Sequence, residues 1–325
     1  MSSMDSSEMR QLGKTGIKVT AIGLGASEFG GGEGWKGGMH PPMPQERKNA
    51  IIKAALDGGI NWFDTAELYG GGISERSLAV ALKANGRHNG DVVMVTKWFP
   101  LLRTAGNIGR TIEERLHCLD GFAIDLYMVH HSLGFSSVEA EMNAMADLVE
   151  AGKIRSVGVS NFNAAQMHRA HKTLATRGLP LAVNQVRYNL LQRGIESNGV
   201  LETAKELGIT IVAYYPLASG MLTGKYHREP ALLARKPWWR RRLMMQREFD
   251  RGRMLVAAME EMAGRYGATP AQLALNWLIH AHGETVVAIP GATRPQHAAE
   301  SAAAMRFRLS EDDMRELDAP SRARS

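Results

Sequence analysis

Four titratable residues stand at or just after apolar stretches, and their types suit proton transfer. Asp64 ends the apolar run in "GINWFDTAELYGG", and Tyr69 follows five residues later. Lys97 ends "DVVMVTK", and His130 ends "DLYMVH". A lysine ammonium beside a phenol favours the phenolate and lowers the pKa of the tyrosine, while a nearby aspartate keeps the lysine charged. If the fold brings these four side chains together, Tyr69 becomes a general acid or base near neutral pH.

Each of the four also has a structural interpretation. Asp64 can cap the following turn, Lys97 can extend to the surface, and His130 can be a hydrogen-bonded core imidazole. Tyr69 alone can be a loop aromatic. The wider pattern favours chemistry, because further apolar runs end in polar groups in the same way: Ser160 with Asn161, then Gln185, then Tyr214.

The elements that must position these residues alternate between strands and helices. Eight candidate strands lie in "TAIGLG", "NWFDTA", "DVVMVTK", "DLYMVHH", "RSVGVSN", "AVNQVRY", "TIVAYYP" and "TVVAIPG". Helical patterns separate them, and glycines end several of these helices, as in "ALDGG", "VEAGK" and "KELGI". The chain is therefore predicted to be α/β, a (β/α)₈ TIM barrel, whose active site lies at the carboxyl ends of the strands.

Additions to the barrel are predicted at both of its ends. A β-hairpin around Lys14 to Gly16 precedes the first strand, and "TPAQ" at Thr269 is a capping box that starts a late helix. The segment from Tyr226 to Glu248 is too long for an ordinary connection, so we expect it to cover the mouth. Residues 1–325 form one predicted domain, with flexible ends at 1–8 and 319–325.

These motifs resemble the aldo-keto reductase superfamily, in the branch related to potassium-channel β subunits. The resemblance runs from "LGKTGIKVTAIGLGA" to "AIPGATRPQHAAES". It implies a catalytic tetrad of Asp64, Tyr69, Lys97 and His130 through "DTAELYG", "VTKW" and "DLYMVHH". It implies hydride transfer between a nicotinamide cofactor and a carbonyl carbon, with Tyr69 as the proton donor. Lys97 and Asp64 would assist Tyr69, and His130 would orient the carbonyl oxygen.

The resemblance also implies the cofactor contacts. The nicotinamide would be held by Ser160, Asn161 and Gln185 and would stack on Tyr214, and the pyrophosphate would meet Leu217 and Ser219 in "YYPLASGMLTGKY". The adenosine end would meet a set of residues in "IPGATRPQHAAES": Gly291, Thr293, Arg294, Gln296, His297 and Glu300. Many members carry a lysine where this chain has Gly291, so Arg294 is the expected phosphate donor. NADP(H) is favoured, and NAD(H) remains the alternative.

The substrate pocket is expected between three loops: Ser27–Gly38, Phe99–Thr104 and Tyr226–Arg247. Trp35, Trp98 and Phe99, together with Trp238 or Trp239, are predicted to form an apolar wall, and His131 to add a polar group where many members have tryptophan. Both an aromatic aldehyde and a sugar suit such a wall. No metal site is predicted.

The expected function is reduction of an aldehyde or ketone. Two alternatives are an NAD-dependent dehydrogenase of a sugar or cyclic alcohol, and a nucleotide-binding regulatory subunit. The expected partner is a small carbonyl or alcohol, and the sequence assigns no oligomeric state.

Composition and charge distribution restrict the other classes of protein to which the chain could belong. No apolar run is long enough for a signal peptide or a membrane span, and the single cysteine, Cys118, favours a reducing cytoplasm and a core thiol. The formal charge is +6, and the Arg235–Arg253 stretch with Trp238 and Trp239 carries much of it. A nucleic-acid binder more usually spreads basic residues over a broad face, so a solvated or substrate-covering loop is expected there.

Overall fold

A computed structural model of the protein describes residues 9–32, 40–234 and 246–322. Eight parallel strands form one sheet in the order β10-β9-β8-β7-β6-β5-β4-β3. Isolated parallel bridges, Ile22 to Ala288 and Gly25 to Gly291, join its first and last strands, so the sheet curls into a barrel. The strands are β3 (Leu24–Gly25), β4 (Trp62–Asp64), β5 (Val93–Trp98), β6 (Ile124–Val129), β7 (Ile154–Ser160), β8 (Leu181–Arg187), β9 (Thr210–Tyr214) and β10 (Val286–Ala288). The predicted barrel and its strands are confirmed.

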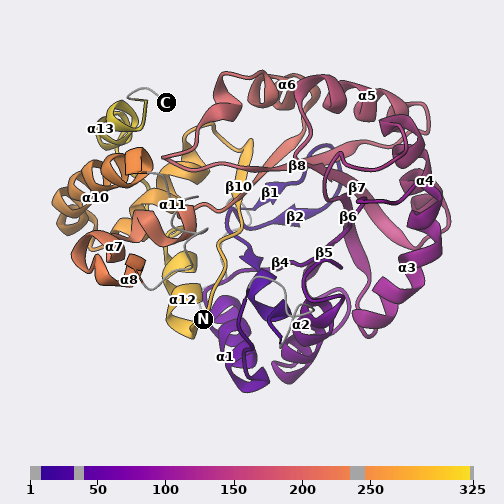
Figure 1. Ribbon diagram of the computed structural model, residues 1–325, viewed down its shortest axis with the longest axis horizontal. Helices are drawn as coiled ribbons and strands as arrows, with labels where there is room; N and C mark the ends of the chain where they lie inside the picture. Colours follow the sequence, from indigo (N-terminus) through magenta and orange to yellow (C-terminus); the bar gives the residue numbers. More distant parts are fainter. Residues whose placement is uncertain (1–8, 33–39, 235–245, 323–325) are drawn as a thin grey trace.

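Helices surround the barrel on its outside (Figure 1). The last main helix before each of the strands β4 to β10 is, in order, α1 (Gln45–Asp57), α2 (Ile73–Ala84), α3 (Gly106–Cys118), α4 (Val138–Glu150), α5 (Ala164–Ala175), α6 (Val200–Leu207) and α11 (Pro270–His280). The others are η2 (Ser27–Gly30), η4 (Gly194–Glu196), η5 (Ala218–Thr223), α7 (Lys225–Arg228), α8 (Ala231–Ala234), α10 (Gln246–Tyr266), α12 (Pro295–Ala303) and α13 (Glu311–Arg322). α13 packs on α10, and part of the C-terminal end that was expected to be flexible is helical.

The helix ends follow the capping rules that the sequence suggested. Gly208 after α6 adopts the left-handed conformation, with φ of 69°, which costs glycine little. Thr269 accepts a hydrogen bond from the Gln272 amide and Gln272 returns one, with Pro270 at the first helical position of α11. The predicted capping box is confirmed, and the thiol of Cys118 is fully buried, as expected of a core residue.

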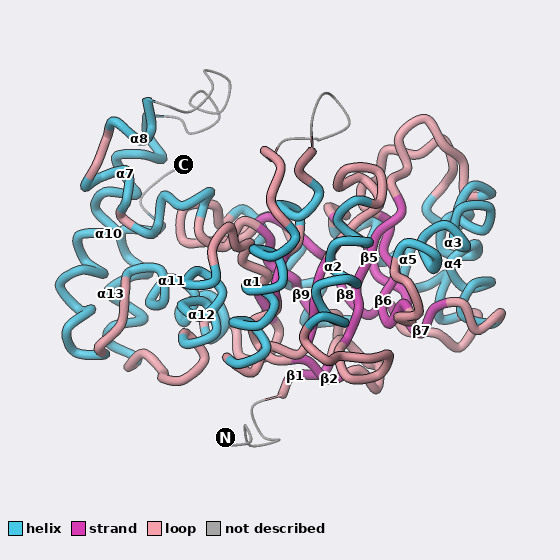
Figure 2. The backbone as a smooth tube through the Cα atoms, turned by 90° about the horizontal axis from the view of Figure 1, so that it is seen from below, coloured by secondary structure: helices cyan, strands magenta, loops and turns pink. Residues whose placement is uncertain are grey.

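The N-terminal hairpin closes one end of the barrel. β1 (Arg10–Gln11) pairs with β2 (Lys18–Val19), and the Gly13 amide donates to the Thr210 hydroxyl at the start of β9. Leu12, Ile17 and Val19 are buried in the same cluster as the apolar side chains inside the barrel. Figure 2 shows the hairpin below the strands. Because the hairpin covers the amino ends of the strands, only the carboxyl ends are left to form an open mouth.

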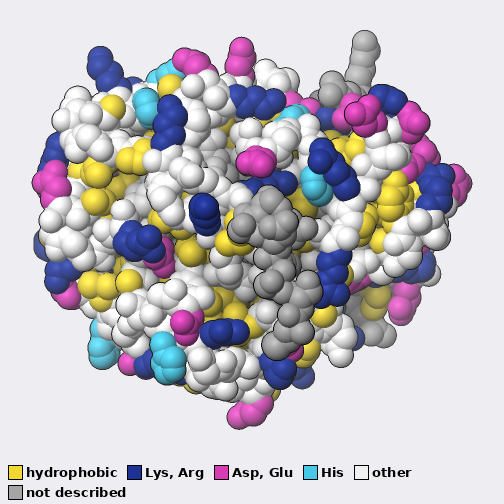
Figure 3. All heavy atoms as spheres, turned by 180° about the vertical axis from the view of Figure 1, so that it is seen from behind, with side chains coloured by type: hydrophobic (Ala, Val, Ile, Leu, Met, Phe, Trp, Pro, Cys, Tyr) yellow, Lys and Arg dark blue, Asp and Glu magenta, His cyan; other side chains and the backbone are white. Residues whose placement is uncertain are grey.

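The opposite face of the molecule carries the connections after each strand. Figure 3 shows the other side of the molecule, the face that the hairpin closes; the Lys and Arg side chains on it are scattered and do not form one stripe. Much of the long basic insertion, including Trp238 and Trp239, lies outside the described residues, and so does Trp35. Where the insertion is described, it forms α7, α8 and the start of α10.

Candidate active site

Alternation along the strands directs the polar residues into the barrel. Successive side chains of a strand point to opposite faces, and Trp62 and Val95 belong to the cluster inside the barrel. Asp64 and Lys97, each two residues further on, therefore point inward at the mouth. The same step from Met128 leads to His130, from Val183 to Gln185 and from Val212 to Tyr214. Because side chains alternate along each strand, these five predicted residues all point into one common space.

Lys97 and Asp64 form a buried ion pair at the centre of this space. The Nζ–Oδ1 distance is 2.6 Å, and the two side chains are 0% and 3% exposed. Lys97 also donates to the Thr65 carbonyl at 2.8 Å, and Gln185 Nε2 donates to the other oxygen of Asp64 at 2.8 Å. Burial lowers the pKa of Lys97, and the carboxylate of Asp64 opposes that shift. The carboxylate is the partner that keeps an ammonium charged where no water reaches it.

Tyr69 returns over this pair by a tight turn. Gly70, Gly71 and Gly72 all have positive φ, and a Cβ on Gly30 would lie 2.5 Å from the Tyr69 carbonyl carbon, so the chain passes closely there. The ammonium of Lys97 lies 5.3 Å from the centre of the Tyr69 ring. In the fragment "GINWFDTAELYGG" the strand therefore ends in a carboxylate that pairs with Lys97 beneath the Tyr69 phenol.

The electrostatics of Tyr69 correct one expectation. Burial raises the pKa of the phenol well above its usual value, and the negative charges of Asp64 and Glu28 raise it further. The expectation that Lys97 would give an acidified phenol is wrong for this arrangement. Tyr69 is fully protonated near neutral pH, which suits a group that donates a proton to an alkoxide.

His130 faces Tyr69 as a neutral imidazole. The two rings meet edge to face, with centroids 5.7 Å apart. Burial lowers the pKa of His130 to about 2, and the charges of Lys97 and His131 add to the shift. Its Nδ1 is buried and has no hydrogen-bond partner among the described residues. A lone pair is cheaper to leave unpaired than an N–H, so we assign the proton to Nε2, the nitrogen that remains able to donate to a carbonyl oxygen.

A chain of amides and hydroxyls continues from His130 around the mouth. Asn161 has a left-handed backbone, with φ of 60°, and its Nδ2 reaches Ser160 Oγ at 3.0 Å and His131 Nδ1 at 3.1 Å. Its Oδ1 accepts from the Tyr214 hydroxyl at 2.8 Å, and Ser160 Oγ donates to the Gln185 carbonyl at 2.8 Å. The Tyr214 ring is thereby pinned at its hydroxyl end and only half-buried, which leaves room for a planar ring to stack on it.

His131 and Trp98, two of the predicted substrate residues, have different positions. His131 stacks on His130 with centroids 5.1 Å apart and is partly exposed beside Asn161, so the structure places it at the mouth. Trp98 lies elsewhere. It follows Lys97 by one residue and so points outward; it is fully buried and donates from its indole to Asn107 at 2.9 Å. Trp98 therefore packs between the barrel and α3 and forms no wall of the mouth.

The expected phosphate region begins in η5. Ala218 and Ser219 have positive φ, and so does Gly220, which turns the chain sharply after β9 (Thr210–Tyr214) and Leu217. The Tyr226 hydroxyl donates to the Ser219 carbonyl at 3.3 Å. The Lys225 side chain folds back onto this turn, because a Cβ on Gly220 would lie 2.6 Å from Lys225 Nζ.

Residues 291–300 lead from β10 (Val286–Ala288) into α12 (Pro295–Ala303). Arg294 caps α12, and Thr293 contacts the Nδ1 of His297 at 3.3 Å through its hydroxyl. Burial lowers the pKa of His297, and the cations of Lys225 and Arg294 act in the same direction. Arg294 directly precedes α12, and the charge of Lys225 acts on His297 in the first turn of that helix. Gln296 is exposed, and the Glu300 carboxylate accepts a hydrogen bond from the Thr269 hydroxyl at 2.5 Å.

The chain has Gly291 where many family members carry a lysine, and the Glu28 side chain lies in the space that a larger side chain would need. A Cβ on Gly291 would lie 2.4 Å from the carboxylate of Glu28. Burial raises the pKa of Glu28. The carboxylate of Glu28 therefore occupies the side-chain space of residue 291.

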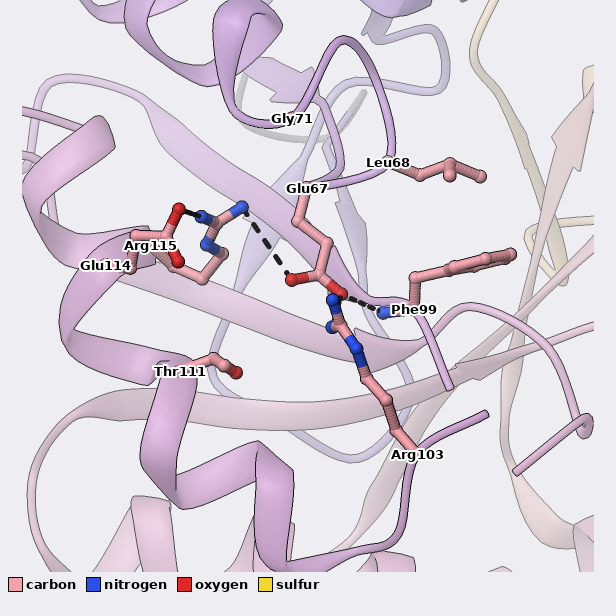
Figure 4. A pocket seen from close by; sticks show the side chains of 8 residues that line it. All are labelled: Glu67, Leu68, Gly71, Phe99, Arg103, Thr111, Glu114 and Arg115. Atoms are coloured by element: carbon pink, nitrogen blue, oxygen red, sulfur yellow. Dashed lines mark hydrogen bonds and ion pairs between the residues drawn. The ribbon is translucent and has the colours of Figure 1, made fainter. Parts of the chain in front are cut away.

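Sequence reasoning missed Lys225 and two acids, Glu28 and Glu67. Lys225 lies within "YYPLASGMLTGKY", but it was given no role there, and its place depends on the positive-φ turn of η5. Glu67 is visible in "DTAELYG", but its partners come from the loop after the next strand. A pocket of about 330 Å³ lies beside Glu67, behind the Tyr69 turn (Figure 4). It is lined by Glu67, Leu68, Gly71, Phe99, Arg103, Thr111, Glu114 and Arg115.

The described residues contain neither a metal-binding cluster nor a membrane-spanning helix. Among the described residues, no three His, Cys, Asp or Glu side chains are grouped so that they could hold a metal ion. Within the same ranges, no helix is long and apolar enough to pass through a membrane.

Comparisons with known proteins identify the family to which the chain belongs. A model of the aldo/keto reductase family matches residues 21–322. The chain belongs to this family. Pyridoxal reductase of Arabidopsis thaliana is 31% identical over 315 residues, which cover 93% of this chain and 83% of the relative. A fission-yeast relative from Schizosaccharomyces pombe, named aldo-keto reductase yakc [NADP(+)], is 31% identical over 292 residues, covering 86% of this chain and 84% of the relative.

Solved structures of family members have the same fold. A glycerol dehydrogenase from Gluconobacter oxydans superposes with a TM-score of 0.80 at 26% identity, covering 97% of this chain and 95% of the other. An aldo-keto reductase from Klebsiella pneumoniae in complex with NADPH superposes with a TM-score of 0.72 at 28% identity, covering 95% and 94% of the two chains. Family membership makes the chain an oxidoreductase that acts on small carbonyl compounds.

Proposed function

We propose that the protein reduces an aldehyde or ketone to an alcohol with NADPH, with Tyr69 as the proton donor. The observation that carries the proposal is the Lys97–Asp64 pair under a protonated phenol, with a neutral imidazole at its edge. The residues present fit a nicotinamide cofactor, because the half-buried Tyr214 ring is hydrogen-bonded to amide and hydroxyl side chains at the mouth. Ser160, Asn161, Gln185 and Tyr214 would hold the nicotinamide end.

A bound nicotinamide supplies the hydride, and the chain's own residues control the proton. His130 Nε2–H donates to the carbonyl oxygen of the substrate and orients it toward Tyr69. As negative charge develops on that oxygen, the Tyr69 hydroxyl transfers its proton to it. The phenolate that remains faces the Lys97 ammonium, whose positive charge favours it. Asp64 keeps this ammonium charged and in place.

The experiment that tests the function is a screen of aldehydes and ketones with NADPH and with NADH, followed by the loss of reduced-nicotinamide absorbance. We expect carbonyl-dependent oxidation of NADPH at a higher kcat/KM than of NADH. Turnover of alcohols with NAD⁺ and no reduction of any carbonyl would favour the dehydrogenase alternative. Nucleotide binding without turnover in either direction would favour a regulatory subunit.

The preference for NADPH is proposed to depend on Lys225 and Arg294. Arg294 directly precedes α12, the charge of Lys225 acts on His297 in the first turn of that helix, and both side chains are exposed. A charge-assisted contact with a phosphate contributes about 1.5–3 kcal/mol. We therefore expect Lys225→Ala and Arg294→Ala each to raise the KM of NADPH about tenfold or more, while the KM of NADH stays within about twofold.

Arg228→Ala is the matched control for these two variants. Arg228 is an exposed cation close in sequence to Lys225, but it is paired with Glu260 at 2.6 Å. The Arg228→Ala variant is expected to leave the KM values of NADPH and NADH unchanged. Equal losses for NADPH and NADH in the Lys225 and Arg294 variants would show that these cations do not recognise the 2′-phosphate.

A further inference from the structure

The orientation of the His130 ring depends on neighbouring rings and not on a hydrogen bond. Its Nδ1 has no partner among the described residues, whereas a functional histidine usually has its second nitrogen held by an acceptor. Three rings surround the imidazole instead. His131 stacks on it at 5.1 Å, Tyr69 meets it edge-on at 5.7 Å, and Phe99 meets it edge-on at 5.8 Å. A shift of any of these rings turns the nitrogen that faces the substrate.

Phe99 stands on a loop that one buried carboxylate holds. The backbone N–H of Phe99 donates to Oε1 of Glu67, and Arg103, further along the same loop, donates to the same oxygen at 2.7 Å. The other oxygen of Glu67 lies 3.8 Å from the guanidinium of Arg115. Figure 4 shows Glu67 between these groups, with Phe99 extending away from them. The side chain of Glu67 is 8% exposed, so water replaces little of this contact if it is lost.

The same residue belongs to the Tyr69 turn. The Glu67 amide donates to the Lys97 carbonyl at 3.3 Å, and its carbonyl accepts from the Gly72 amide at 3.2 Å. Glu67 is therefore fixed by its backbone to the strand of Lys97 and to the turn of Tyr69. Through the hydrogen bond from the Phe99 amide, the Glu67 side chain fixes the next loop relative to that strand and turn.

We propose that Glu67 is a positioning residue that holds Phe99 against His130 and so sets the direction of the His130 Nε2–H. This role rests on the proposed carbonyl reduction. Glu67 does not touch the reacting atoms, and its effect passes through Phe99. The carboxylate joins the loop after β4 (Trp62–Asp64) to the loop after β5 (Val93–Trp98), which carry the phenol and the Phe99 ring on two sides of one imidazole.

The test is a double-variant cycle on a carbonyl that the parent protein reduces. We expect Glu67→Ala and Phe99→Ala each to lower kcat by about 10- to 100-fold, because a displaced catalytic group costs a factor of this size. The dissociation constant of NADPH should stay within about twofold. The primary isotope effect on kcat, with NADPH deuterated at the transferred position, should rise as hydride transfer becomes slower than product release.

The combination of the two changes is the decisive measurement. If Glu67 acts through Phe99, the double variant loses no more activity than either single variant, because the two residues form one unit. Glu67→Gln keeps an oxygen that can accept from the Phe99 amide and should recover most of the lost kcat. Glu114→Gln is the control, because Glu114 lines the same pocket and contacts Arg115 but not Phe99.

Other results would overturn the proposal. Losses that multiply in the double variant would mean that the two residues act independently. A lower melting temperature with the parent kcat and isotope effect in the folded fraction would make Glu67 a structural residue only. A parent protein that reduces no carbonyl would overturn the proposed function first and this role with it.

Discussion

Replacing Tyr69 by phenylalanine is expected to lower kcat for carbonyl reduction by about 10³-fold, within the range of positioned acid–base groups. The change removes one hydroxyl and keeps the ring that packs against His130 at 5.7 Å. The developing alkoxide then has no proton donor on the side of Lys97. The phenol makes no hydrogen bond to the amides at the nicotinamide end, so the affinity for NADPH should stay within about twofold. Stopped-flow absorbance and a fluorescence titration of NADPH measure the two quantities.

The dependence of the parent enzyme on pH follows from the same phenol. Since burial and the charges of Asp64 and Glu28 raise the pKa of Tyr69 well above its usual value, the phenol stays protonated from neutral into alkaline solution. The reductive rate should therefore not fall through the ordinary range of tyrosine titration. Tyr215→Phe is a suitable control, because Tyr215 is a rim tyrosine with an exposed ring. If Tyr69→Phe reduces aldehydes at the parent rate, Tyr69 is not the proton donor.

The arrangement of the barrel could be predicted because it depends on local patterns. Eight apolar runs with helical segments between them specify parallel βα units, and glycines such as Gly208 mark where helices stop. The tetrad followed from the same information, since strands that run in parallel bring their last residues to one edge. The position of Trp98 was also open to this reasoning. A residue next to an inward-pointing lysine must point outward, and that alternation contradicts a place in the substrate wall.

Other features depend on contacts that the order of residues does not contain. The pKa of Tyr69 is set by the depth of its burial and by Glu28, which reaches the site from another loop. The contact between Glu67 and Phe99 joins two loops, and the charge of Lys225 acts on His297, some seventy positions further along the chain. Reading each motif by itself gives the residue types at these places and misses their partners.

Replacing Lys97 by methionine is expected to lower both activity and stability. The variant leaves the Asp64 carboxylate buried without its cation, and breaking a buried pair in this way costs about 3–5 kcal/mol in the free energy of unfolding. It also removes the positive charge that faces the Tyr69 ring at 5.3 Å, so the phenolate formed by proton transfer is no longer favoured. We expect kcat to fall by about 10²-fold or more. Urea unfolding and steady-state kinetics measure the two effects.

Two further variants separate the loss of the pair from the loss of a buried lysine. Lys48 is also buried and donates to the Phe29 carbonyl at 3.0 Å and the Ser77 hydroxyl at 2.7 Å, so Lys48→Met strands no charged partner and should cost less stability than Lys97→Met. The double variant Asp64→Asn with Lys97→Met removes both charges, and it should recover a large part of the stability but none of the activity. Recovery of activity in that double variant would mean that Lys97 serves only to neutralise Asp64. Failure to recover stability would instead show that Lys97 contributes through its bond to the Thr65 carbonyl, which the double variant also lacks.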